Sequence, residues 1–305
     1  MTDDHELVAG QVARDLVLRV DDVPGPQASV TARERREVLG GKGANQAVGL
    51  TQLGVPVALL GVVGDDREGV RLLDQAREDG IDTSSVVRRP GATTGLVVNL
   101  VDAHGHWHYV EDLPAEVQLT EDDVAGARPA RCVVVQLQQP SAAALAATRL
   151  STGLVVLEGA PADDEHRDAL LAAADVVRAD ATEARLLTGA DLDSAETAVA
   201  AARELLHSHD LALVALGVEN GDVFVWRDGG RIFSHGDAEV VDSTGGGDAL
   251  TAALTSVLLR GGGPEEAARL AVAASAATVE HPGGRPDLTP KRLRHFLRKS
   301  RSHAV

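Results

Sequence analysis

The sequence predicts an α/β fold in which helices cover both faces of a parallel sheet, with a small β-layer outside that body. Short apolar runs alternate with longer alanine- and leucine-rich stretches, and two regions interrupt this rhythm with strand-like patterns. Apolar strands separated by helices favour parallel pairing through right-handed crossovers, because both faces of such a sheet are buried. We expect residues 1–305 to form one domain, with the outer β-layer drawn from about residues 11–37 and 93–111.

The elements of the body follow from the period of their apolar residues. Short apolar runs predict buried strands, and helical spacing predicts the helices between them, the first of which ends at Gly80. In chain order we expect a strand at 57–63, a helix at 67–80, a strand at 132–137, a helix at 141–150, a strand at 153–157, a helix at 164–174, a strand at 175–178, helices at 181–187 and 195–207, and a strand at 211–217.

The outer β-layer is predicted from two segments. Val12, Leu16, Leu18 and Val20 recur at even spacing, which places them on one face of a strand. Farther along, two strand-like runs flank a turn at Asp102-Ala-His-Gly105, a good signal for a hairpin. An appendage of this kind can cover a binding site and exclude water from it.

Composition and charge exclude several classes of function. Acidic residues number 46 against 29 basic ones, and the net charge of -17 disfavours nucleic acid and anionic membranes as partners. The single Cys132 excludes a disulfide within the chain. No apolar run approaches the ~18 residues of a membrane span, and the acidic N-terminus is unlike a signal peptide. We expect a soluble cytoplasmic protein.

The first segment that indicates chemistry is Gly40-Gly-Lys-Gly-Ala-Asn-Gln-Ala47. Its glycines allow a backbone to approach a ligand closely, and a helix-prone stretch follows from residue 44. Lys42 and Asn45 can donate hydrogen bonds to hydroxyls or anions. The spacing is not that of a P-loop, and a tight strand-to-helix turn remains the alternative.

The second segment is Val241-Asp-Ser-Thr-Gly-Gly-Gly-Asp248, which precedes a helical pattern at 249–259. Gly245, Gly246 and Gly247 predict a flexible turn at the helix N-terminus, where free N–H groups and the helix dipole suit a phosphoryl group. Asp248 is either a favourable charge in the first turn of the helix or a general base that accepts a proton from an attacking hydroxyl.

Together the two segments resemble the signatures of the ribokinase-like (PfkB) carbohydrate kinase family, in the form typical of ribokinases. The resemblance also reaches Gly64-Asp-Asp66, Asp180-Ala-Thr-Glu183 and Gly283-Gly284, and so covers nearly the whole chain. It implies a three-layer αβα sandwich with a mostly parallel central sheet and a small β-sheet lid. It also implies an ATP-dependent sugar kinase that transfers the γ-phosphate to a hydroxymethyl group of a ribose-like or related small sugar.

The same resemblance implies roles for individual residues. Asp248 matches the catalytic base, and Gly245, Gly246 and Gly247 match the anion hole. The implied acceptor-binding residues are Asp15, Gly41, Lys42, Asn45 and Gln138. The implied nucleotide-binding residues are Asp180, Ala215, Gly217, Gly247 and Val272.

Two cation sites are implied in the same way. Asp180 and Glu183 match a motif that orders Mg²⁺ and its waters, with Asp replacing the usual Asn. The same two residues also fit a helix N-cap with a capping box, and both interpretations can hold. A monovalent cation, K⁺ in many relatives, would be surrounded by Asp242, Thr244, Thr278, Gly283 and Asp287.

Departures from the ribokinase pattern leave the acceptor open. Ala13 stands where an Asn is expected, and Gln138 stands where a Glu is expected. A lost buried partner for a substrate hydroxyl can change selectivity by ~10⁴-fold, so ribose itself is uncertain. Gln11 and Arg14 are candidate replacement donors, although strand alternation would point Arg14 away from Asp15.

Several alternatives remain open at this point. A nucleoside kinase of the same fold usually needs aromatic walls, and this chain is only 2% aromatic. A degenerate member would bind sugar or nucleotide without turnover. His104, His106 and His108 could share a strand face and bind a metal, which we consider the less favoured interpretation. The exposed edge of the lid sheet suggests a homodimer.

Overall fold

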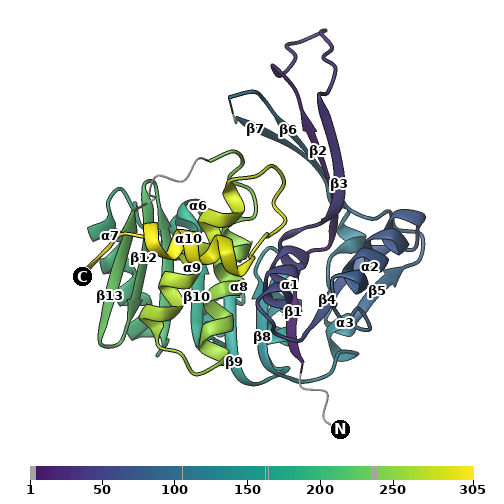
Figure 1. The fold of residues 1–305 in the computed structure, drawn as a ribbon. Helices are drawn as coiled ribbons and strands as arrows, with labels where there is room; N and C mark the ends of the chain where they lie inside the picture. The colour runs from purple at the N-terminus through teal and green to yellow at the C-terminus, as the bar shows by residue number, and fades with distance from the viewer. Residues whose placement is uncertain (1–4, 105, 162, 164, 235–239) are drawn as a thin grey trace.

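The computed structural model describes residues 5–104, 106–161, 163, 165–234 and 240–305, and Figure 1 shows its two sheets. The large sheet has ten strands in the order β14-β13-β12-β11-β10-β9-β8-β1-β4-β5. Neighbouring strands are parallel from β11 to β5 and antiparallel from β11 to β14. These strands are β1 (Glu6–Ala9), β4 (Val57–Gly64), β5 (Val86–Arg89), β8 (Ala130–Gln136), β9 (Ser151–Glu158), β10 (Val176–Ala179), β11 (Leu213–Val218), β12 (Gly221–Trp226), β13 (Gly229–Ser234) and β14 (Ser302–Ala304).

Helices cover both faces of this sheet, so the predicted three-layer αβα arrangement is confirmed. One buried apolar cluster joins the sheet to α3–α7, and a second joins it to α1, α2, α8 and α9. Helix α10 packs on α9 through a third cluster. The helices are α1 (Lys42–Gln52), α2 (Arg67–Glu78), α3 (Glu121–Ala125), α4 (Ser141–Thr148), α5 (Arg167–Ala173), α6 (Ala181–Thr188), α7 (Ala195–Ser208), α8 (Gly246–Leu259), α9 (Pro264–Val279) and α10 (Pro290–Lys299), with a short 3₁₀ turn at Ala115–Val117.

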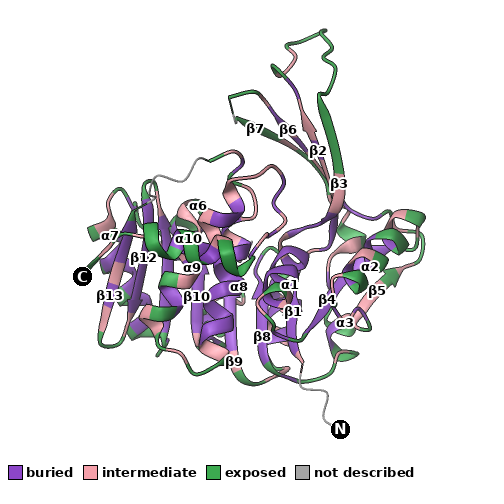
Figure 2. Cartoon of the chain, in the orientation of Figure 1, coloured by how far each residue is buried: buried purple, intermediate pink, exposed green. Residues whose placement is uncertain are grey.

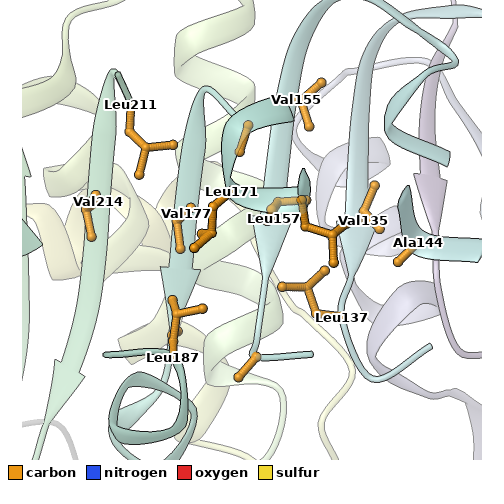
Figure 3. Close-up of a cluster of buried hydrophobic side chains, with 14 of the residues drawn as sticks. Val135, Leu137, Ala144, Val155, Leu157, Leu171, Val177, Leu187, Leu211 and Val214 are labelled. Carbon is orange, nitrogen blue, oxygen red and sulfur yellow. The ribbon is translucent and has the colours of Figure 1, made fainter. Parts of the chain in front are cut away.

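The first cluster shows why the parallel strands read as unbroken apolar runs. Val135, Leu157, Val177 and Val214 point from β8, β9, β10 and β11 into the same layer, where Leu171 of α5 meets them (Figure 3). Each is fully or almost fully buried, and burial of one such side chain stabilises the fold by roughly 1.5–3 kcal/mol. The carboxyl ends of the strands are thereby held in fixed positions.

The small sheet stands apart from the body, as predicted (Figure 1). It has the order β3-β2-β6-β7, built from β2 (Ala13–Arg19), β3 (Glu34–Gly40), β6 (Leu96–Val101) and β7 (Trp107–Asp112). The predicted hairpin corresponds to the antiparallel pair β6–β7, although Gly105 of its turn lies outside the described residues. Strand β7 is largely exposed, and β3 is exposed over its first three residues (Figure 2).

Some elements differ from the sequence prediction. The antiparallel strands β12, β13 and β14 were not predicted, although Asn220-Gly221 between two apolar runs is a hairpin signal. Helix α1 begins at Lys42 rather than at residue 44, and α8 begins at Gly246, so two of its three predicted turn glycines lie in the first helical turn. Among the described residues, no helix is long and apolar enough to cross a membrane.

Candidate active site

The turn before α1 depends on glycines for close packing. Gly41 has a φ of 85°, a region that favours glycine. A Cβ on Gly40 would overlap the carboxyl group of Asp15, and a Cβ on Gly43 would lie 2.6 Å from the backbone carbon of Gly10. This turn therefore packs backbone against backbone, and it brings Asp15 of β2 beside the start of α1.

The turn before α8 is also rich in glycine, and a Cβ on Gly245 would overlap the backbone carbonyl of Gly284. Gly245 has a φ of 70° and precedes the first helical residue. Within the described part of the chain, the amide N–H groups of Gly245, Gly246 and Gly247 have no hydrogen-bond acceptor. Unpaired N–H groups at a helix N-terminus bind anions.

Asp248 lies in the first turn of α8 and is 5% exposed. Its carboxylate accepts hydrogen bonds from Asn45 Nδ2 at 3.1 Å and from Gln46 Nε2 at 3.3 Å, both on α1. Burial, followed by the nearby charge of Glu158, raises the pKa of Asp248 to about 7. A carboxyl group with such a pKa can exchange a proton near neutral pH.

A polar cavity of about 360 Å³ lies between the small sheet and the body. We define it by Asp15, Lys42, Asn45, Tyr109 and Asp248, which all line it. Burial, and then the charge of Asp248, raises the pKa of Asp15 to about 7. Gly41 and Gln138 also line this cavity, so every predicted acceptor-binding residue is brought together here.

Four buried or partly buried charges form a cluster at this cavity, and three of them, Lys42, Glu158 and Arg178, line it. Lys42 Nζ lies 2.5 Å from Glu183 Oε1 and 3.4 Å from Glu158 Oε1. Arg178 Nη1 lies 2.8 Å from Glu158 Oε1 and 3.9 Å from Glu183 Oε2. Burial opposes each charge, but the two cations outweigh burial and hold the pKa of Glu183 below its ordinary value. Each side chain of this cluster has a partner of opposite charge.

A second, apolar cavity of about 300 Å³ lies on the far side of the α8 N-terminus. It is defined by Gly217, Val218, Leu250, Val272 and Val279, and Asp180 and Gly247 line it as well. Four of the five predicted nucleotide-binding residues therefore surround it. The fifth, Ala215, lies within β11 with its side chain buried in the core, and it does not line the cavity.

Asp180 and Glu183 form the predicted capping box at the start of α6. Asp180 Oδ1 accepts from the amides of Thr182 and Glu183, and Glu183 Oε2 accepts from the amide of Asp180 at 2.9 Å. Among the described residues, the second carboxylate oxygen of Asp180 has no hydrogen-bond donor. Because Asp180 lines both cavities, that oxygen fits a hard cation such as Mg²⁺ there.

The residues predicted around a monovalent cation do not form one shell of side-chain ligands. The buried carboxylate of Asp242 already accepts hydrogen bonds from Thr244 N and Oγ1, Asn99 Nδ2 and Gly283 N. Thr278 Oγ1 donates to its own helix at Ala274 O. The Asp287 carboxylate lies 3.7 Å from Arg292 Nε. These side chains do not fit a cation without rearrangement, and K⁺ dependence stays a prediction.

The sequence analysis did not single out Gln46, Glu158 or Arg178 as site residues. Their partners are distant in the chain, as with Gln46 and Asp248, so spacing gave no signal. A usable signal was present for Glu158 and Arg178. Each is a charged residue at the carboxyl end of an otherwise apolar strand, the edge at which α/β sheets bind ligands.

Two aromatic residues form part of the wall of the polar cavity. Trp107 and Tyr109 of β7 stack with ring centroids 4.5 Å apart, and both line the polar cavity. The Tyr109 hydroxyl also contacts Thr244 Oγ1 across the gap between the small sheet and the body. His106 Nδ1 lies 2.9 Å from Asp102 Oδ2, and no metal-ligand cluster in the described residues contains the three histidines.

This arrangement suits the transfer of an anionic group to a hydroxyl. A buried carboxylate with a raised pKa lies beside an open helix N-terminus, between a polar and an apolar cavity. The carboxylate can accept the hydroxyl proton, and the helix N-terminus can stabilise the anion.

Comparison with known proteins agrees with this class of chemistry. The sequence matches the pfkB family carbohydrate kinase over residues 4–292. It is 28% identical to a ribokinase from Haemophilus influenzae over 92% of this chain and 94% of that protein. It is 31% identical to an ATP-dependent ribose-1-phosphate kinase from Halopiger xanaduensis, over 95% and 97%. The fold is similar to that of an Arabidopsis thaliana ribokinase solved with ribose and ATP, with a TM-score of 0.78, 24% identity, and 96% and 98% coverage.

The chain belongs to the pfkB family of carbohydrate kinases, with ribokinases among its relatives. Members of this family are phosphotransferases that act on an alcohol group. The protein is therefore a sugar kinase of the ribokinase group, and its particular sugar is the remaining question.

Proposed function

We propose that this protein transfers the γ-phosphate of ATP to a hydroxymethyl group of a ribose-like or related small sugar. The observation that carries the proposal is the position of Asp248. Its carboxylate lines the polar cavity beside the N-terminus of α8, and Gly247 of the same helical turn lines both cavities. An acceptor in one cavity and a nucleotide in the other would meet at this turn.

The proposed reaction uses the two cavities separately. The adenine lies in the apolar cavity against Gly217 and Val272, and the acceptor lies in the polar cavity with Asp15, Lys42 and Asn45 as hydrogen-bonding partners. Asp248 accepts the proton of the attacking hydroxyl, and the amides of Gly245–Gly247 stabilise the transferring phosphoryl group. Asp180, oriented with Glu183 in the capping box, would hold Mg²⁺ through water. The ion would neutralise phosphate charge.

The charges of the polar cavity favour a neutral acceptor with many hydroxyls. Lys42 and Arg178 are the cations among its described lining residues, and both are already paired with carboxylates. Arg14 points elsewhere, with its Nε 3.2 Å from Glu37 Oε1. A phosphate on the acceptor would therefore meet the carboxylates of Asp15 and Glu111, neither of which is paired with Lys42 or Arg178. We therefore expect an acceptor different from that of the Halopiger relative, whose name specifies a phosphorylated acceptor.

A nucleoside acceptor is the second candidate, favoured by one observation. The chain has two Trp and one Tyr, and Trp107 and Tyr109 stack along the wall of the polar cavity. An aromatic wall of this kind can stack on a base. A member that binds ligands without turnover is the third candidate, and the same assay distinguishes all three.

We also propose a homodimer formed through the small sheet, in the cytoplasm where ATP is available. The edge strand β7 and the first three residues of the edge strand β3 are exposed, and Val110 on β7 is 63% exposed. Open edges of this kind pair readily with a second sheet. Light scattering on the purified chain and on the V110D variant tests this: a dimer that becomes a monomer in V110D supports it, and a monomeric wild-type chain contradicts it.

The experiment that tests the activity is ADP release from Mg-ATP with a panel of acceptors and potassium present. The panel contains ribose, deoxyribose, fructose, sugar acids, sugar phosphates and nucleosides, with Asp248→Ala as the blank. We expect a neutral pentose to give turnover that the blank lacks. A nucleoside as the preferred acceptor would establish the second candidate. ATP binding without ADP release from any acceptor would overturn the kinase proposal.

A further inference from the structure

The polar and apolar cavities have four lining residues in common. These are Arg178, Asp180, Ser243 and Gly247. Under the proposed function, a phosphoryl group moving from nucleotide to acceptor must pass this junction. Arg178 is the one cation among the four, and nothing in the family signatures described above includes it.

The position of Arg178 is fixed by the centre of the large sheet. It lies on β10, which pairs with β9 and β11 on either side, and the residue is 7% exposed. Glu158 at the end of β9 holds Nη1 at 2.8 Å. Within the described residues this is the only hydrogen bond of a group that has five N–H donors, so the guanidinium retains capacity for another acceptor.

The guanidinium lies directly against the first turn of α8. A Cβ on Gly247 would be 2.6 Å from Nη1 and 2.7 Å from Nη2, closer than side-chain packing allows. The guanidinium therefore occupies space that is open only because residue 247 has no side chain. The amide N–H groups of Gly246 and Gly247, which have no acceptor in the described chain, begin the same turn.

Electrostatics explains why a cation is needed at this point. The chain has a net charge of -17, and Asp15, Glu111 and Asp248 line the polar cavity. A phosphoryl group in transit carries negative charge on its equatorial oxygens, which these carboxylates repel. Lys42 lines the polar cavity but not the apolar cavity, whereas Arg178 lines both. The planar fork of an arginine suits two oxygens of one phosphoryl group.

We propose that Arg178 is a catalytic residue whose guanidinium binds the phosphoryl group during transfer, together with the amides of Gly246 and Gly247. In the step itself, the bond from the γ-phosphorus to the bridging oxygen breaks, and ADP leaves with the electron pair. The acceptor oxygen forms the new bond to phosphorus, and its proton passes to Asp248. Arg178 stays protonated throughout. This inference rests on the proposed function.

The first test compares R178Q and R178K with wild type, using the best acceptor of the panel. We expect kcat to fall about 10³-fold in R178Q, at the lower end of what an arginine contributes to phosphoryl transfer. The KM for the acceptor should change less than about threefold. The matched control is R231Q, which removes a guanidinium of β13 that is paired with Glu265 of α9. This variant should keep its kcat. A kcat of R178Q within threefold of wild type would overturn the proposal.

A second test separates catalysis from charge balance. R178Q leaves Glu158 without its buried partner, so the double variant E158Q/R178Q removes both charges. Full activity in the double variant would show that Arg178 serves only to neutralise Glu158, which contradicts the proposal. In R178A, added guanidinium ion should restore kcat at least tenfold and saturably, whereas the neutral analogue urea should not. Equal rescue by both compounds, or by neither, also contradicts it.

A third test does not depend on the acceptor. Tetrafluoroaluminate with Mg-ADP mimics the phosphoryl group in transit, and such mimics bind more tightly than ground-state ligands. Calorimetry measures the affinity for Mg-ADP with and without tetrafluoroaluminate. The wild-type protein should bind Mg-ADP more tightly when tetrafluoroaluminate is present, and R178Q should lose most of this increase in affinity. If tetrafluoroaluminate increases the affinity of R178Q for Mg-ADP as much as it does for wild type, the proposed role of Arg178 is contradicted. If no acceptor in the panel is phosphorylated, the proposed function fails, yet this measurement still tests Arg178.

Discussion

Helices α1 and α8 both begin at glycine-rich turns, and the two turns use their glycines differently. At α1, Gly43 packs against the backbone of Gly10, so its missing side chain permits close packing. At α8, Gly247 packs against the guanidinium of Arg178 at the junction of two cavities. Each turn also has a neighbouring carboxylate with a pKa of about 7, Asp15 beside α1 and Asp248 within α8. Gly43 therefore serves structure, whereas Gly247 serves the proposed chemistry.

The largest expected effect distinguishes the two carboxylates. D248N should lower kcat about 10³-fold, because general-base catalysis contributes about 10²–10⁴-fold, while the Kd of ATP stays within threefold. D15N should mainly raise the KM of the acceptor, about tenfold or more, because Asp15 binds the sugar. Steady-state kinetics and calorimetry of both variants measure this. A larger loss of kcat in D15N than in D248N would reverse the assignment.

The stability of D248N serves as its folding control. The raised pKa means that burial disfavours the ionised carboxylate, so Asp248 lowers the stability of the folded state as pH rises from about 4 to about 7. Asn removes this cost. D248N should therefore melt no lower than wild type at pH 8, with the difference shrinking toward pH 5. A melting temperature well below wild type at pH 8 would show that the loss of activity reflects folding.

The next effect contrasts the two turn glycines. G247A should lower kcat about 10²-fold, because its Cβ would displace the guanidinium of Arg178 from the helix turn. Its melting temperature should change by less than about 2 °C. G43A should instead lower stability by about 2 kcal/mol, because its Cβ would meet rigid backbone at Gly10.

Melting curves and kcat per folded protein check this pair. A loss of about 2 kcal/mol corresponds to about 3 °C in a chain of this size. We expect G43A to lose melting temperature more than kcat, and G247A to lose kcat more than melting temperature. If both variants lose melting temperature and kcat to the same extent, Gly43 and Gly247 do not have the different roles proposed for them.

The smallest effect concerns pH. Because the base must be ionised, kcat/KM should rise with pH and level off above the pKa of Asp248, about 7. After burial, the charge of Glu158 is the next cause that raises this pKa. E158Q should therefore move the inflection to lower pH, by roughly one unit. E265Q, on the surface helix α9, should leave the profile unchanged, and an upward shift in E158Q would contradict the proposed electrostatics.

How much the sequence predicts depends on whether a feature is local. The body strands β4, β8, β9, β10 and β11, the hairpin β6–β7 and the two glycine-rich turns follow from local period and composition, and the structure contains them. The pairing of Glu158 with Lys42 joins residues 116 positions apart, and no local pattern encodes it. Strand alternation likewise does not reveal which side of β11 faces the apolar cavity, and the structure buries Ala215 in the core.

The most direct test of the central claim is a crystal structure with Mg-ADP, tetrafluoroaluminate and the acceptor that the panel identifies. We predict that the fluoride complex lies where the two cavities meet, about 3 Å from the amide nitrogens of Gly246 and Gly247. The acceptor hydroxyl should lie within hydrogen-bond distance of the Asp248 carboxylate. A fluoride complex bound away from the N-terminus of α8, or an attacking hydroxyl held by Asp15 instead of Asp248, would contradict the account.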